Sequence, residues 1–323
     1  MESTESAVLR LTVGIEPPEH REILVRCLNG NVSPAVALMR LLIDTEDAAA
    51  VRGTVDEITM RAASLSRAGD NLIRDRVDEL TQLMVDNELG CERIAEMLRN
   101  AMNSPEMAPT VEAGIGFCER LFDWSVQQSE EASVALYSLG SSTLLERATK
   151  EVVQQLEDWG VIGRDRTVLD IGCGIGRIAA ALGPRVRDVH GIDISTGMIK
   201  IALKRCEPHT NVHLLKSSGH DLREFPDASF DTVIAVDTFP YINQSGPSLV
   251  ESYFGETVRV LRPSGDFVIL NFSYYGDDDS DQADISRLAK LYGFDVLVSG
   301  EHPFTIWDGS AFHLRKRPSK SIT

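Results

Sequence analysis

Hydrophobic residues follow two different spacings along the chain. Between about residues 34 and 128 they recur every three or four positions, as in the segment Leu72–Met84, with charged side chains between them. This spacing predicts about five amphipathic helices. A weaker pattern in residues 8–15 predicts one short strand before them. From Val168 onward, short apolar runs alternate with helical patterns, which is typical of βα units and of a mostly parallel sheet with helices on both faces.

Seven apolar runs in this second region have the length and composition of strands. They are Val168–Ile171, Val189–Ile192, Val212–Leu215, Thr232–Val236, Phe267–Asn271, Phe294–Val298 and Ala311–Leu314. A joint near Gly140–Ser142 precedes a helix expected from Thr143 to about Trp159. We therefore expect a mainly helical N-terminal region over residues 1–140 and an α/β domain over residues 141–323.

Charge bears on the choice of partner. The 323-residue chain has a formal net charge of −17, and residues 1–130 hold 23 acids against 12 arginines, with no lysine before Lys150. Proteins that bind nucleic acids depend on basic side chains that meet phosphates, so nucleic acid is not an expected partner. The basic cluster Arg315–Arg317 is expected to be a solvated tail, and the acidic run Gly276–Asp281 a solvated loop and not a metal site.

Composition points to a globular cytoplasmic protein. Hydrophobic residues make up 43% of the chain, and no apolar run is long enough for a membrane helix, so no membrane partner is expected. The first ten residues have no basic segment of the kind that opens a signal peptide. The five cysteines form no C-x-x-C pair, which predicts reduced thiols and no zinc site.

The stretch VLDIGCGIGRIAAALGPRVRDVHGIDIS, residues 168–195, carries the candidate chemistry. It reads strand, glycine-rich turn, helix and strand, in the pattern D-x-G-x-G-x-G. Arg177 stands where a dinucleotide fingerprint needs its third glycine. A carboxylate at Asp170 would repel a diphosphate but suits a ligand with an ammonium group. Asp193, at the end of the next strand, is placed to accept both hydroxyls of a ribose.

Two further segments extend the pattern. They are GHDLREFPDASFDTVIAVDTFPYI (219–242) and VLRPSGDFVILNF (260–272). Together with the glycine-rich unit, in this order and spacing, they resemble the class I S-adenosylmethionine (SAM)-dependent methyltransferase family over roughly residues 143–317. The resemblance implies a seven-stranded, mostly parallel Rossmann-like sheet. Its last strand, around 311–314, should run antiparallel beside 294–298.

The resemblance also implies SAM as cofactor and S-adenosylhomocysteine (SAH) as product. The positions that match the family's cofactor-binding residues are Asp170, Gly172, Cys173, Gly174, Gly176, Asp193, Ile194, Asp221, Leu222 and Asp237. Asp170 would bind the ammonium group, Asp193 the ribose, and Ile194 the adenine face. The Asp221 side chain and the Leu222 amide would contact the adenine edge. Ser218 and His220 are alternatives for that contact, because the loop alignment can slip by one residue.

Acceptor-side residues follow from the same resemblance. Asp237 would border the methyl group and the acceptor, and Asp237, His220 and His302 are candidate general bases. Tyr241, in DTFPY, is similar to the aromatic of an acidic-Pro-Pro-aromatic motif, but the match is imperfect and leaves the acceptor atom open. Tyr137 is expected to close over SAM, with a half-buried hinge tyrosine as the alternative.

The resemblance predicts a methyltransferase that acts on an oxygen or nitrogen atom of a small molecule by direct displacement. A protein acceptor, an aminopropyl transferase and a non-catalytic SAM-binding module stay open, and an NAD-linked oxidoreductase is disfavoured by Arg177. Residues 1–140 are expected to cap the acceptor pocket or to form a homodimer contact.

Overall fold

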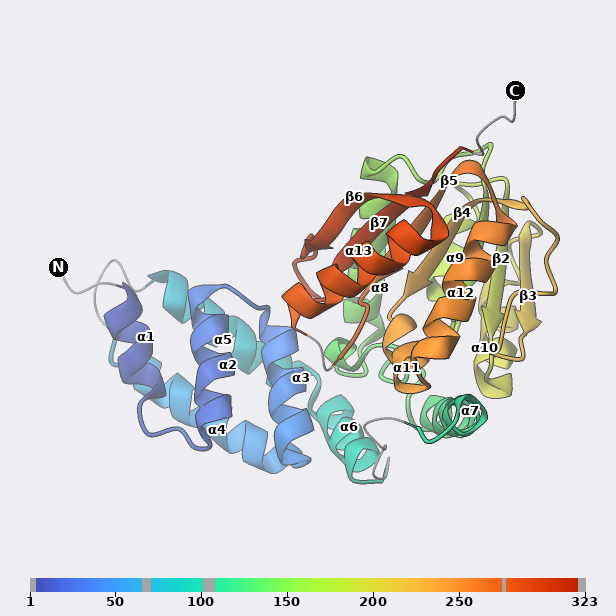
Figure 1. Ribbon diagram of the computed structural model, residues 1–323. Coiled ribbons are helices and arrows are strands. Elements are labelled where there is room, and N and C mark those ends of the chain that lie inside the picture. Colours follow the sequence, from blue (N-terminus) through green and yellow to red (C-terminus); the bar gives the residue numbers. More distant parts are fainter. Residues whose placement is uncertain (1–3, 66–70, 101–107, 275–276, 319–323) are drawn as a thin grey trace. The chain divides into compact units, whose positions relative to one another are not determined.

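The computed structural model describes residues 4–65, 71–100, 108–274 and 277–318. The helices are α1 (Thr4–Thr12), α2 (Pro18–Asn29), α3 (Pro34–Thr45), α4 (Ala48–Ala62), α5 (Asn71–Asp86), α6 (Glu88–Asn100), α7 (Val111–Gln128), η2 (Leu136–Ser138), α8 (Ser142–Asp158), α9 (Arg177–Leu182), α10 (Thr196–Cys206), α11 (Phe239–Gln244), α12 (Pro247–Val260) and α13 (Asp278–Tyr292). The strands are β1 (Thr167–Ile171), β2 (Asp188–Asp193), β3 (Val212–Lys216), β4 (Phe230–Val236), β5 (Leu261–Leu270), β6 (Phe294–Glu301) and β7 (Ala311–Lys316). Figure 1 labels these elements except β1 and η2.

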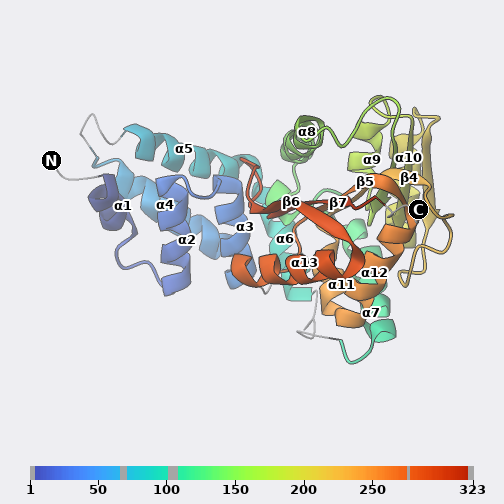
Figure 2. The same ribbon diagram turned by 45° about the horizontal axis from the view of Figure 1, so that its top comes forward.

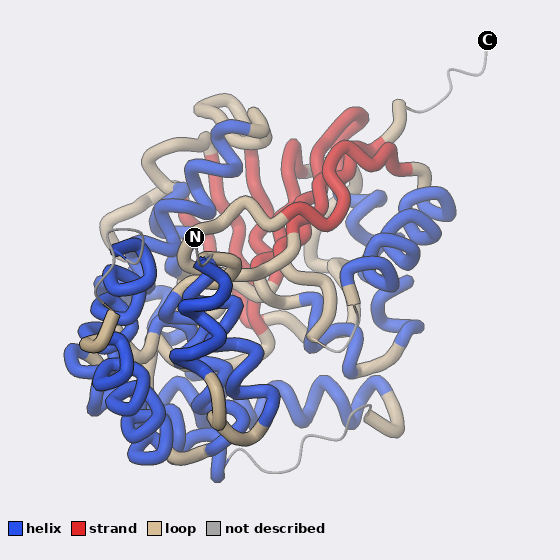
Figure 3. Tube along the Cα trace, turned by 90° about the vertical axis from the view of Figure 1, so that its left-hand side faces the viewer, coloured by secondary structure: helices blue, strands red, loops and turns tan. Residues whose placement is uncertain are grey.

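The sheet has the order β3-β2-β1-β4-β5-β7-β6. Strands β1 to β5 pair in parallel, and β7 pairs antiparallel with both β5 and β6. The strands form one continuous layer (Figure 3), with α9 and α10 on one face and α12 and α13 on the other (Figure 2). The predicted α/β class, the seven strands and the antiparallel last strand are confirmed.

Contacts divide the chain into two compact units. The helical unit contains Met1–Met102, Gln128–Ala148 and Phe304–Asp308, and the sheet unit contains Asn103–Gln127, Thr149–Pro303 and Gly309–Thr323. In this division α7 belongs to the sheet unit and 304–308 to the helical unit, and the predicted division into 1–140 and 141–323 stays a prediction. Whether residues 1–140 cap a pocket or form a dimer contact stays a prediction.

The helical unit buries one apolar stripe from each of its helices. Leu24, Leu38, Ile58, Leu80 and Ile94, from five successive helices, are fully buried. The amphipathic helices predicted between about residues 34 and 128 are confirmed as α3 to α7. The strand predicted over residues 8–15 is wrong. Those residues overlap α1, because the buried positions 7, 8 and 11 are spaced to form one face of a helix.

Two charged segments differ from their predicted state. The basic cluster at 315–317 was expected to be a solvated tail, but Arg315 and Lys316 belong to β7. The Arg315 guanidinium donates to the buried Asp266 carboxylate at 2.8 Å, and Lys316 Nζ donates to the Leu261 carbonyl at 2.6 Å. Most of the acidic run opens α13, where Asp277 accepts from the Ser280 amide at 2.7 Å as an N-cap. Of its residues, Gly276 lies outside the described ones.

Candidate functional site

The glycine-rich turn joins β1 to α9 and brings the backbone close to the end of β4. Gly172, Gly174 and Gly176 all have positive φ, at 71°, 53° and 74°. A Cβ on Gly172 would lie 2.3 Å from Thr238 Oγ1, so this position needs glycine for space as well as for conformation. The Thr238 hydroxyl donates to the Ile171 carbonyl at 2.8 Å. The turn therefore lies beside the residue that follows Asp237.

Asp193 ends β2 and holds the turn in place. Its Oδ2 accepts from the Gly174 amide at 2.9 Å, and its Oδ1 accepts from the Ser195 amide at 2.8 Å. Burial raises the pKa of Asp193 to about 6, although these amide bonds act in the opposite direction. Each carboxylate oxygen can accept a second hydrogen bond, so Asp193 can hold the turn and still accept from a ribose.

Asp170 lies one strand away and is 1% exposed. Its Oδ2 has no hydrogen-bond partner in the part of the chain that the structure describes. Its pKa is raised to about 7, mainly by burial; the Arg177 charge opposes this shift, and the Asp193 charge adds to it. A buried carboxylate oxygen without a partner is costly unless a ligand supplies a donor or a positive charge.

The side chains of Cys173 and Arg177 are buried and pack away from the turn. The Cys173 thiol is buried, and its Sγ would lie 3.1 Å from a Cβ on Gly191 in β2. Burial raises its pKa well above the usual value, so it is a packed, unreactive thiol. The buried Arg177 side chain donates to Thr149 Oγ1 of α8 at 3.1 Å. It therefore contributes to the packing of α8 against α9.

Helix α7 contributes residues that sequence reasoning missed. Asp123 Oδ1 accepts from Ser195 Oγ at 2.6 Å and from the Gly197 amide at 2.8 Å, so it binds the loop that follows Asp193. Nearer its start, a Cβ on Gly219 would lie 3.1 Å from Ile115 of α7 and 2.8 Å from Ile194. Asp123 precedes the predicted domain and carried no motif, so no local signal identified it.

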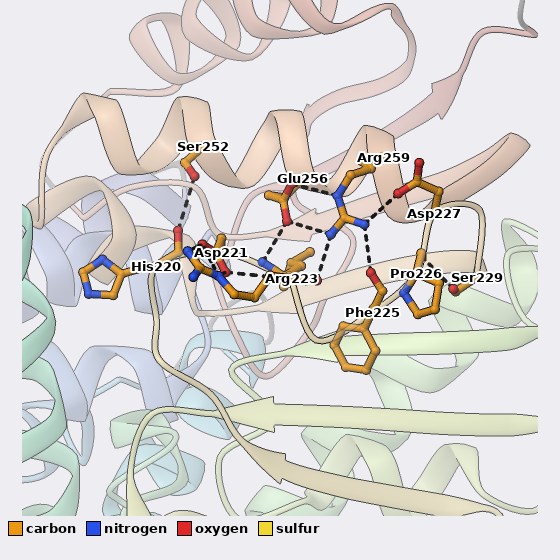
Figure 4. Close-up of polar contacts among 11 residues, drawn as sticks. His220, Asp221, Arg223, Phe225, Pro226, Asp227, Ser229, Ser252, Glu256 and Arg259 are labelled. Atoms are coloured by element: carbon orange, nitrogen blue, oxygen red, sulfur yellow. Dashed lines mark hydrogen bonds and ion pairs between the residues drawn. The ribbon is translucent and has the colours of Figure 1, made fainter.

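The loop after β3 carries the predicted adenine contacts, and Figure 4 shows how it is held. The Arg259 guanidinium of α12 donates to the Leu222 carbonyl at 2.9 Å and to the Phe225 carbonyl at 2.8 Å. It also donates to both carboxylate oxygens of Glu256, at 2.8 and 2.7 Å. Arg259 and Glu256, defined here as the loop clamp, fix the backbone of residues 222–225 against α12.

Glu256 of the loop clamp accepts a hydrogen bond from a backbone amide that the sequence analysis assigned to the adenine of SAM. The Leu222 amide, predicted to donate to adenine, donates to Glu256 Oε2 at 3.1 Å. Asp221 forms two hydrogen bonds of 2.8 and 2.9 Å with Arg223 Nε, and these bonds lower its pKa. The His220 carbonyl accepts from Ser252 Oγ at 3.3 Å. The adenine roles of Asp221 and Leu222 stay predictions. For these roles, Asp221 and the Leu222 amide would have to bind adenine in addition to Arg223 and Glu256, or in place of them.

Asp237 follows β4 and lies at the centre of a polar and aromatic group. Its Oδ1 accepts from Asn271 Nδ2 at 2.8 Å and from the Tyr274 hydroxyl at 2.9 Å. Tyr241 meets Tyr274 edge to face, with ring centroids 5.6 Å apart, and meets Phe122 of α7 at 4.8 Å. Tyr274 was missed because it lies beyond the segment 260–272, in the loop that follows β5.

The other predicted residues lie elsewhere. Tyr137 belongs to the helical unit, where it is buried and stacks on Trp307 with centroids 5.7 Å apart, and its role over SAM stays a prediction. His302 Nε2 lies 3.1 Å from Asp278 in an exposed pair. Within the described residues, no acidic, histidine and cysteine group is arranged to hold a metal ion, and no helix is long and apolar enough to cross a membrane.

Known proteins match the same part of the chain. The methyltransferase domain family matches residues 169–269. A demethylmenaquinone methyltransferase of Tropheryma whipplei is 36% identical over 107 residues, which cover 33% of this chain and 42% of that one. Phosphoethanolamine N-methyltransferase 1 of Arabidopsis thaliana is 31% identical over 150 residues, which cover 46% of this chain and 28% of that one. The matches thus span less than half of either relative.

A solved structure shares the fold. It is phosphoethanolamine N-methyltransferase 1 of Haemonchus contortus in complex with phosphoethanolamine and S-adenosylhomocysteine. The TM-score is 0.52 at 17% identity, over 66% of this chain and 51% of that one. At this identity the likeness concerns the fold alone.

Proposed function

We propose that this chain, whose residues 169–269 belong to the class I SAM-dependent methyltransferase family, transfers a methyl group from SAM to an oxygen or nitrogen atom of a small-molecule acceptor. SAM is the cofactor of that family. The relatives named above act, by their names, on demethylmenaquinone and phosphoethanolamine, which are small molecules. The proposal for the whole chain rests on its own residues, because these relatives are matched only in part.

The observation that carries the proposal is the unpartnered Oδ2 of Asp170 beside the glycine-rich turn. A buried carboxylate there fits the ammonium group of an amino acid and opposes the diphosphate of a dinucleotide. Asp193 lies on the neighbouring strand, where a carboxylate can accept from a ribose. The side chain of Arg177, at the position of the third dinucleotide glycine, is directed to Thr149. The turn thus suits a nucleoside joined to an amino acid.

Each part of the site has a defined task. Asp193 would bind the ribose through charge-assisted hydrogen bonds, each worth about 1.5–3 kcal/mol. The glycine-rich backbone would leave room for the methionyl part, and the loop clamp would hold the segment at the adenine edge. Asp237 would orient the acceptor and hold or release its proton. Tyr241 and His220 are the other groups predicted to act on the acceptor side.

When bound, SAM supplies a sulfonium-activated methyl group that is open to direct displacement. The chain therefore has to align the acceptor atom in line with the breaking C–S bond and to exclude competing water. Alignment of this kind can lower a barrier by about 7–11 kcal/mol in well-oriented systems. Asp237, placed beside Thr238 and the glycine-rich turn, is the residue best located for this task.

Calorimetric titration with SAH tests the proposal. We expect micromolar binding to the wild type, loss of at least about tenfold in affinity for Asp193→Ala, and no binding of NADH. Asp188→Ala is the matched control, because Asp188 lies at the opposite end of β2 and forms surface ion pairs with Arg187 and His213. Failure of the wild type to bind SAH, or a preference for NADH, would reject the cofactor and with it the proposed function.

A further inference from the structure

Three aromatic rings and one carboxylate meet beyond the ends of β4 and β5. They are Phe122, Tyr241, Tyr274 and Asp237, which we call the aromatic–acidic cluster. Tyr241 is the central ring, since Phe122 lies edge to face with it at 4.8 Å and Tyr274 does so at 5.6 Å. The Tyr274 hydroxyl ties the rings to Asp237 Oδ1 at 2.9 Å. The four residues come from three separate segments, so the tertiary fold assembles the cluster.

The side chains of the cluster are partly exposed. Phe122, Tyr241 and Asp237 are half-buried, and Tyr274 is 46% exposed, although large aromatic side chains are usually packed more fully. Asp237 precedes Thr238, which lies against Gly172 of the glycine-rich turn. The cluster is therefore adjacent to the place where the methionyl part of SAM is expected.

The backbone around the cluster is strained in a way typical of functional sites. Asp237 has φ 58°, in the left-handed region that residues other than glycine seldom adopt. Asn271, which directly follows the neighbouring strand β5, has φ 69° and donates to Asp237 at 2.8 Å. Two non-glycine residues held in this conformation and joined to each other fix one carboxylate orientation.

The chain segment that follows Tyr274 is rich in carboxylates. Tyr274 is followed by the acidic start of α13, and within this segment Ser273 Oγ donates to Asp281 Oδ1 at 2.8 Å. Asp277, Asp278 and Asp279 lie on the same turn. Carboxylates at this density attract cations and repel anionic ligands. Aromatic faces also attract cations, through the negative face of the ring.

We propose that the acceptor carries a cationic amine or ammonium group, which the aromatic–acidic cluster binds. This inference rests on the proposed methyltransferase function and adds the substrate class. Phe122, Tyr241 and Tyr274 supply ring surface, and Asp237 supplies the counter-charge. The Asp237 carboxylate would repel an anionic acceptor, and it would contribute no charge attraction to a neutral aromatic acceptor.

Choline and its uncharged isostere, 3,3-dimethyl-1-butanol, are the probes for this test. Both are titrated calorimetrically into full-length protein saturated with SAH, so that cofactor binding is established before the acceptor side is measured. We expect choline to bind at least about tenfold more tightly than the isostere, because the two differ only in charge. Equal affinities, tighter binding of the isostere, or no binding of either probe would overturn the cationic acceptor.

Variants identify the cluster as the source of the preference. Tyr274→Leu and Asp237→Asn should each reduce the choline-to-isostere ratio by about fivefold or more. Tyr292→Leu is the matched control, a partly buried tyrosine at the end of α13 that lies outside the cluster, and it should leave the ratio unchanged. The melting temperature is measured for every variant and reports whether the fold is intact. An unchanged ratio in Tyr274→Leu and Asp237→Asn would overturn the assignment to this cluster.

The two proposals fail in distinguishable ways. If the wild type does not bind SAH, the methyltransferase function itself is rejected. If SAH binds but the charged and uncharged probes bind alike, the cofactor assignment stands and only the cationic acceptor is rejected.

Discussion

Asp237 and Asn271 directly follow the neighbouring parallel strands β4 and β5, and the Asn271 amide donates a 2.8 Å hydrogen bond to Asp237 Oδ1. Both residues have positive φ, at 69° and 58°. The carboxyl ends of β4 and β5 thus hold one carboxylate in a single orientation beside the glycine-rich turn. Asn271 acts on the acceptor side through Asp237 and is a positioning residue.

Asn271→Ala should lower kcat about tenfold while SAH affinity changes less than about twofold, because the substitution frees Asp237 but leaves Asp170, Asp193 and the glycine-rich turn unaltered. Asn271→Gly is the control for backbone strain, since glycine accepts positive φ but also lacks the amide. If Asn271→Gly keeps wild-type kcat, the Asn271 amide has no positioning role. Steady-state kinetics and SAH titration of both variants make this comparison.

The raised pKa values of Asp170 and Asp193, about 7 and about 6, make the ligand-free protein sensitive to pH. In the unfolded chain these carboxyls titrate near pH 3.9, so between about pH 4 and 7 the folded state binds more protons. Their contribution to the free energy of unfolding is full below the unfolded pKa and is lost as pH rises through 6 to 7. SAH binding needs the ionised carboxylates and should strengthen over the same range.

The measurement is the melting temperature between pH 5.5 and 8, with and without saturating SAH. We expect the stabilisation by SAH to grow with pH. Asp170→Asn, which cannot titrate at this position, should flatten most of that rise. A stabilisation by SAH that is independent of pH in the wild type would contradict the assigned roles of both carboxylates.

The loop clamp should be sensitive to the shape of its cation. Arg259 donates to two carbonyls and to Glu256 at once, which a lysine ammonium cannot reproduce. We expect Arg259→Lys to weaken SAH binding about tenfold and to lower the free energy of unfolding by about 1–3 kcal/mol. Arg287→Lys is the control, because Arg287 forms exposed pairs with Glu251 and Asp284 and should change stability by less than about 0.5 kcal/mol. Equal effects of the two substitutions would show that the clamp is unimportant.

Asp123 should determine how firmly α7 is attached. Its carboxylate accepts from Ser195 and Gly197, and Asp123→Ala leaves both donors without this partner. We expect faster amide hydrogen exchange over residues 111–127 and SAH affinity reduced by about fivefold to tenfold. Glu119→Ala, which removes an exposed pair with Lys216, serves as the control and should have little effect. Unchanged exchange in Asp123→Ala would exclude this anchoring role.

Gly172 cannot accept a side chain without local rearrangement. A Cβ there would lie 2.3 Å from Thr238 Oγ1, and the backbone has φ 71°. Gly172→Ala should therefore destabilise the protein by about 1–3 kcal/mol and abolish measurable SAH binding. Gly53→Ala in α4 is the opposite case, because a Cβ there meets nothing within 4 Å, and it should stabilise by about 0.5–1 kcal/mol. Chemical denaturation of both variants measures the free energy of unfolding, which should fall for Gly172→Ala and rise for Gly53→Ala.

The sequence by itself determined the alternating βα order, the glycine-rich turn and the carboxylates Asp170 and Asp193 at successive strand ends. These features are local, because strand periodicity, turn conformation and strand-end position all depend on residues within a few positions of one another. The same local reasoning mistook the start of the chain for a strand, since its apolar residues fit either period over so short a run.

Only the tertiary structure decided which distant side chains complete the site. Asp123 is 72 residues from Ser195, and both Tyr274 and Arg259 are 37 residues from their partners Asp237 and Leu222. Parallel pairing predicts that strand ends meet at one edge, but the loops and crossing helices decide which side chains point there. Hydrogen-bond partners so far apart in sequence leave no periodic signal, because their spacing depends on the lengths of the intervening helices and loops.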